Sequence, residues 1–112
     1  MVIIGPDNGT LMFKIVTVFE RQNNTPFFYE QFSDHYVVNK IQSAFEKSSG
    51  FLGKEILTEN PSRIEIAMCF ESYDNFKNFC NQNSDLITER TKLVDEWCLK
   101  TNQTYSFYFM HS

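Results

Sequence analysis

Four segments of alternating apolar residues are separated by segments of helical periodicity, and this order constrains the fold more than any motif does. The four segments are residues 12–21, 51–59, 63–71 and 104–110. An apolar side chain at every second position is typical of a strand with one face in a hydrophobic core. The short Asn60-Pro61-Ser62 connection predicts that the two middle strands form an antiparallel hairpin. The sequence therefore predicts the order strand, helix, strand, strand, helix, strand.

The two segments between the strands have the apolar spacing of amphipathic helices. The first ends near Gly50, which suits the left-handed position after a helix. Its start is open, because Pro26 after a capping threonine and Ser33 are both good helix starts. The second begins at Ser72, breaks at residues 81–83 and restarts directly afterwards. On the restarted helix we interpret Glu89, Arg90, Lys92, Asp95 and Glu96 as the solvent-facing side.

The length of 112 residues allows one domain with a single core. Residues 12–110 form the predicted α+β unit within this single domain, 1–112. Residues 1–11 are either an upstream extension or a short extended piece that pairs back on the first strand. With 12 Phe and 5 Tyr, the core is expected to be rich in aromatic rings.

Charge and cysteine content exclude several functions. A net charge of -4, with ten Lys and Arg spread along the chain, argues against nucleic-acid binding. Three Cys without a CxxC pair fit reduced thiols, as in the cytoplasm. No segment resembles a membrane span or a secretory signal. We therefore expect a cytoplasmic protein with no membrane contact. No nucleotide-binding motif is present. The glutamates of the hairpin have no His partners, and we expect neither a metal nor a cofactor.

Three of the predicted strands carry apolar or aromatic side chains on both faces. In a ferredoxin-like βαββαβ unit, the right-handed crossovers place both helices on one face of the four-stranded antiparallel sheet. The other face would then expose a large apolar patch. We therefore predict a homodimer that pairs through the open sheet face.

Residues 50–51 (GF) and 70–76 (FESYDNF) carry a resemblance to a known superfamily. Together with the strand order, they resemble the dimeric α+β barrel superfamily, in particular the antibiotic-biosynthesis-monooxygenase-like proteins, over roughly residues 12–110. The resemblance implies a dimeric α+β barrel with a cleft between sheet and helices. Oxygenases of this family act there on electron-rich aromatic substrates without a cofactor. Phe79 occupies a position where relatives often have His, and the haem-degrading residue set has no counterpart here.

Six side chains are candidates for such a cleft. His35 could accept a proton, although a solvent-facing helical His is the alternative. The three tyrosines Tyr29, Tyr36 and Tyr108 could orient a phenolic ligand, and Phe79 and Trp97 could stack on one, or all five could be amphipathic or core residues.

Three functions remain open from these residues. The first is a homodimeric protein that binds a small aromatic or apolar molecule in the cleft without chemistry. The second is a cofactor-independent monooxygenase-like enzyme that acts on a small aromatic substrate, with His35 or a tyrosine as the proton acceptor. The third is a purely structural dimerisation module.

Overall fold

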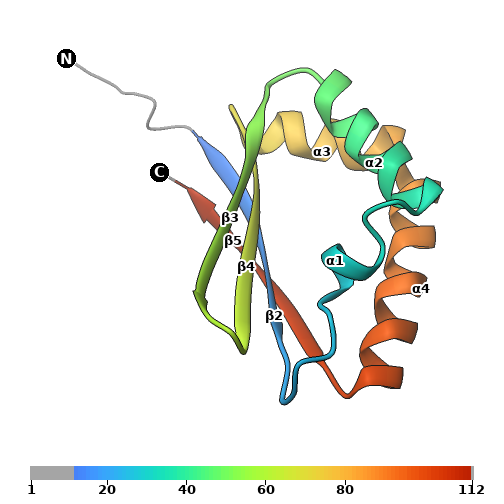
Figure 1. The fold of residues 1–112 in the computed structure, drawn as a ribbon. Helices are drawn as coiled ribbons and strands as arrows, with labels where there is room; N and C mark the ends of the chain where they lie inside the picture. Colours follow the sequence, from blue (N-terminus) through green and yellow to red (C-terminus); the bar gives the residue numbers. More distant parts are fainter. Residues whose placement is uncertain (1–11, 112) are drawn as a thin grey trace.

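The computed structural model describes residues 12–111 and confirms the ferredoxin-like α+β fold. Four strands form one antiparallel sheet in the order β3-β4-β2-β5. The helices all lie on one face of this sheet, and no helix or strand of residues 12–111 covers the other face (Figure 1). In chain order the elements are β2 (Phe13–Glu20), α1 (Phe28–Gln31), α2 (Tyr36–Lys47), β3 (Phe51–Asn60), β4 (Arg63–Phe70), α3 (Tyr73–Gln82), α4 (Ser84–Thr101) and β5 (Thr104–His111). The two interpretations of residues 1–11 concern a segment outside the described residues.

The first helical segment is two helices, and each begins two or three residues after one of the expected starts, Pro26 and Ser33. The four-residue α1 begins just after Pro26, where the Glu30 carboxylate accepts a hydrogen bond from the Phe27 amide. After a turn, α2 begins at Tyr36, and the ring of His35 accepts a hydrogen bond from the Val37 amide. The break predicted at residues 81–83 is also present, between α3 and α4.

The two faces of the sheet bury different side chains. Phe13 and Phe19 point from β2 toward the helices and are fully buried. Val16 and Val18 point the other way, yet only 3% and 6% of their surfaces are exposed. They are small side chains on a central strand, and each has one longer cross-strand neighbour, Tyr108 beside Val16 and Glu65 beside Val18.

Polar side chains surround these valines on the open face. Lys14 forms an ion pair with Glu55 across the sheet at 3.0 Å. The Tyr108 hydroxyl donates to Glu65, also at 3.0 Å. The open face thus shields its own apolar centre in part, which reduces the apolar patch that it exposes.

Aromatic rings dominate the packing between sheet and helices, as the composition predicts. Phe70 on β4 contacts Phe45 of α2 and Phe79 of α3, with ring centroids 6.0 Å apart in both cases. Phe45 and Phe79 stack on each other at 4.0 Å. This group joins both helical segments to the middle of the sheet.

Gly50 links α2 to β3 in a conformation that other residues adopt at a cost. Its φ is +78°, and its carbonyl accepts the Glu71 amide. A Cβ at this position would collide with the Asn75 side chain. Gly53 has a φ of +138° but open space around its Cα.

We expect Gly50→Ala to lower the free energy of unfolding by about 1–3 kcal/mol, because it adds a collision to backbone strain. The matched control is Gly50→Ala in an Asn75→Ala background, where the same strain remains without the collision, and its loss relative to Asn75→Ala should be smaller. Urea unfolding followed by circular dichroism measures both. Equal losses in the two backgrounds would contradict the close packing of Gly50 against Asn75.

Candidate ligand-binding site

A cavity of about 440 Å³ lies between the sheet and the helices. Pockets for small ligands commonly enclose roughly 300–1,000 Å³. Its walls come from all four strands and all four helices, and most of its lining is apolar. The volume and lining are those of a site for a small apolar molecule.

The cavity opens to solvent along β5, which is an edge strand. Phe107 and Phe109 of β5 line the cavity, yet 62% and 50% of their surfaces are exposed. Phe28 and Tyr29 of α1 line it as well. A flat ligand can therefore meet rings from both the sheet and the helical layer.

Two charged side chains line the cavity, and both are cations. They are Lys54, which is exposed on β3, and Arg90, which is partly buried on α4. The chain as a whole has a net charge of -4. The sign of the charge in the cavity is thus opposite to that of the whole molecule, and this favours an anionic ligand.

Arg90 has no anionic partner among residues 12–111. No hydrogen bond or ion pair within this range involves its guanidinium. The guanidinium carbon lies 5.4 Å from the centre of the Phe28 ring, and desolvation lowers the pKa of the side chain. Removing a cation from water without a compensating acceptor is costly. Such a group is well placed to bind an anion that enters the cavity.

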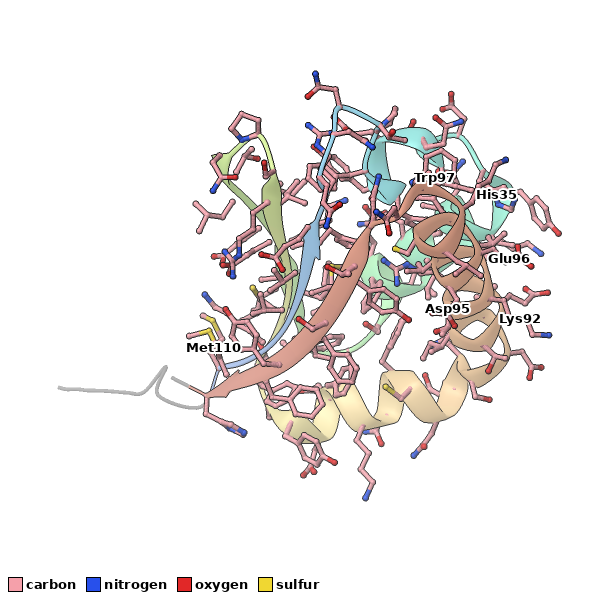
Figure 2. The ribbon with its side chains drawn as sticks, turned by 90° about the horizontal axis from the view of Figure 1, so that it is seen from below. His35, Lys92, Asp95, Glu96, Trp97 and Met110 are labelled. Atoms are coloured by element: carbon pink, nitrogen blue, oxygen red, sulfur yellow. The ribbon has the colours of Figure 1, made fainter. Side chains whose placement is uncertain are left out.

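Tyr105 is the second polar group of this region. It lines the cavity from β5, and its hydroxyl donates to the Asp95 carboxylate on α4 at 2.5 Å. Figure 2 shows Asp95 on the side of α4 that faces β5, whereas Lys92 and Glu96 point away. The hydrogen bond to Asp95, with burial, raises the pKa of Tyr105 to about 12. The phenol therefore stays neutral at physiological pH.

Two of the six candidate residues from the sequence line the cavity. They are Tyr29, from α1, and Phe79, which is almost fully buried on α3. Burial and the neighbouring Glu30 carboxylate raise the pKa of Tyr29, so its phenol also stays neutral.

The other four candidates lie outside the cavity lining and have other contacts. His35 caps α2, and Tyr36 stacks on it with 65% of its surface exposed. The Trp97 indole donates to the Pro26 carbonyl at 3.1 Å. Tyr108 lies on the open sheet face and bonds to Glu65. Their roles in catalysis or ligand binding stay predictions.

The interpretation of Arg90 as a solvent-facing residue is wrong. Leu86, Arg90 and Val94 follow one another at intervals of four, which places them on one face of a helix. Val94 is buried, and Arg90 lies beside it in the cavity wall. A cation within an apolar stripe was the available signal.

Three further properties of the described residues concern metal ligation, membrane spanning and thiol activation. Residues 12–111 contain no group of three His, Cys, Asp or Glu side chains arranged to hold a metal ion. No helix in the same range is long and apolar enough to cross a membrane. Cys80 lines the cavity, and burial raises the pKa of its thiol, so it is not an activated nucleophile.

Known structures share this architecture. SnoaB, a cofactor-independent oxygenase from Streptomyces nogalater, superposes with a TM-score of 0.60 at 14% identity, over 90% of this chain and 92% of that one. A conserved protein from Methanosarcina mazei gives 0.59 at 16% identity, over 89% and 93%. A dimeric ferredoxin-like protein from an uncultured marine organism gives 0.57 at 11% identity, over 90% and 94%.

The shared property is the fold. At these identities the comparison confirms the ferredoxin-like α+β architecture alone. No family model matches the sequence, and no curated protein matches it.

Proposed function

We propose that the cavity binds a small aromatic molecule that carries an anionic group. Aromatic and aliphatic side chains from the sheet and helices contact the body of the ligand. The Arg90 guanidinium binds its charged end. The observation that carries this proposal is the desolvated Arg90 side chain, which has no acceptor among residues 12–111.

The energetics of ligand binding in the cavity support this assignment. An anion at Arg90 replaces the water that the guanidinium loses on folding, and a hydrogen bond to a charged group contributes about 1.5–3 kcal/mol. Lys54 at the rim adds a longer-range attraction. The rings contribute apolar burial, at roughly 25 cal/mol per Å² removed from water. A neutral apolar ligand would gain only the last of these contributions.

We expect 2-naphthoate to bind the wild-type protein, and Arg90→Gln to weaken binding at least about tenfold, because the carboxylate loses its cation. Isothermal titration calorimetry measures the affinity. Lys92→Gln is the matched control, since Lys92 is on the same helix but points away from the sheet (Figure 2). Its affinity should equal that of the wild type.

A second variant separates binding from stability. Arg90→Met keeps most of the side-chain volume and removes a partly buried charge that has no anionic partner among residues 12–111, so it should raise the melting temperature of the ligand-free protein while abolishing naphthoate binding. Equal naphthoate affinity in Arg90→Gln and the wild type would contradict the proposed site.

The functional unit that we propose is a homodimer paired through the open sheet face. Exposed apolar surface on this face comes from Leu57 of β3 and from Tyr108 and Met110 of β5, which are 52%, 43% and 46% exposed. A two-fold contact buries these side chains of both subunits at once. One of the structures with the same fold is described as dimeric.

We expect Leu57→Lys to weaken the dimer at least about tenfold, because the two-fold contact then has to desolvate two ammonium groups. Glu65 lies opposite this position on β4 and should preserve the fold of the subunit. Leu99→Lys is the control, since Leu99 is 88% exposed on α4, away from the sheet face. Sedimentation velocity measures the dimer. A wild-type particle of 13.2 kDa at micromolar concentration would contradict the proposed assembly.

A second candidate function is cofactor-independent oxygenation of the bound aromatic molecule. Arg90 is the observation that favours it, because a guanidinium also stabilises the phenolate or enolate that reacts with oxygen. SnoaB, which has the same fold, is a cofactor-independent oxygenase. A naphthol can be oxidised to a quinone by one O₂ with release of one water, so the substrate itself supplies the electrons.

We expect the protein to accelerate oxygen uptake in the presence of 1,5-dihydroxynaphthalene, and Arg90→Gln to abolish the acceleration. An oxygen electrode measures the rate, and the quinone product is identified by mass spectrometry. His35→Ala tests the predicted proton acceptor: loss of uptake in a variant of unchanged stability supports that role. The same background rate with and without protein would leave binding as the function.

A further inference from the structure

The Tyr105 hydroxyl has a fixed orientation beside the charged end of the cavity. Its ring packs against Phe19 with the centroids 5.9 Å apart, and its oxygen is held by Asp95 at 2.5 Å. Tyr105 and Arg90 both line the cavity, and each group affects the pKa of the other. These contacts place one neutral phenol next to one unpaired cation.

Asp95 determines which hydrogen-bonding role the phenol can take. An ionised carboxylate only accepts hydrogen bonds, so the proton of Tyr105 must point toward Asp95. A length of 2.5 Å lies at the short end of the range for hydrogen bonds between a hydroxyl and a carboxylate. The lone pairs of the phenolic oxygen are what remains for a ligand. Tyr105 is therefore an acceptor, whereas Arg90 is a donor.

We propose that Tyr105, oriented by Asp95, is a specificity-determining hydrogen-bond acceptor that selects ligands with a hydroxyl group near the anionic group bound by Arg90. The ligand class is then a hydroxylated aromatic acid, or a polyphenol that carries one ionised and one neutral hydroxyl. This inference rests on the proposed function, since it assigns the chemistry of a ligand in the same cavity.

The preorganised ring makes this selection effective. Tyr105 is already held by Phe19 and Asp95, so ligand binding does not have to order it. A hydroxyl on the ligand gains a hydrogen bond to the phenolic oxygen. A methoxy group in the same place brings two acceptors together, with no proton between them, and leaves the Tyr105 oxygen without a donor. The ratio of the two affinities reports the selection.

The test compares 2-naphthol with 2-methoxynaphthalene, which are both neutral and differ in the hydrogen-bond donor. We expect the wild-type protein to prefer 2-naphthol by about fivefold. Tyr105→Phe removes the acceptor and should bring the ratio to about one. Tyr73→Phe is the matched control, because Tyr73 is on α3 and outside the cavity lining, and it should keep the wild-type ratio.

Asp95→Asn tests the positioning role separately. The carboxamide can donate to the phenol, which frees the Tyr105 proton to point into the cavity, and the preference for 2-naphthol should fall. A purely structural role of Asp95 would weaken both ligands equally and leave their ratio unchanged. Circular dichroism confirms that each variant is folded.

The outcomes separate this inference from the proposed function. If the wild type shows no preference for 2-naphthol, or keeps one in Tyr105→Phe, the role of Tyr105 is wrong, while binding of 2-naphthoate through Arg90 can still stand. If the preference is present but 2-naphthoate does not depend on Arg90, the anion site and the hydroxylated-acid ligand class are wrong, and Tyr105 stands only as an acceptor for a ligand hydroxyl. If none of these probes binds, both are overturned.

Discussion

Desolvation of the Arg90 guanidinium is the constraint on which the functional interpretation depends. Folding places this cation in an aromatic wall, and no residue between 12 and 111 offers it an acceptor. A core built for stability alone would have an apolar residue there. The arrangement is therefore explained better by a ligand than by packing, since an anion in the cavity restores the interactions that folding removes. Desolvated charges of this kind are common at binding sites.

The one-sided helical cover explains where the cavity and the open face lie. The helices bury Phe13 and Phe19 of β2 but do not reach across the whole sheet, and the edge strand β5 remains exposed on both sides. On one side β5 supplies rings to the cavity mouth, and on the other it borders the face that we assign to a second subunit. The same strand thus belongs to both proposed contacts of the molecule.

The fold could be predicted from the sequence because strand and helix periods are local properties. Which face of each strand meets the helices could not, since both faces carry apolar residues. Tyr105 and Tyr108 lie three positions apart on β5, so they point to opposite faces, and only the tertiary structure shows that Tyr105 is the one in the cavity. The start of the first helix was ambiguous because two good starts lie within one segment, and the segment folds as two helices that begin shortly after them.

The candidate site was predicted less completely than the fold. Tyr29 and Phe79 were among the candidates because large aromatic side chains in the predicted helical segments are expected to pack against the sheet. Arg90 was assigned to solvent on its polarity, although its spacing from Leu86 and Val94 placed it on the buried face. His35 was a candidate proton acceptor and Trp97 a candidate stacking ring. Each instead forms a hydrogen bond with the backbone that no sequence pattern indicates.

A crystal structure of the protein with 2-naphthoate tests the central claim most directly. The account predicts the naphthalene rings between the sheet and the helices, with the carboxylate within hydrogen-bonding distance of the Arg90 guanidinium. A ligand bound elsewhere on the surface, or a carboxylate that points away from Arg90 into solvent, would contradict it.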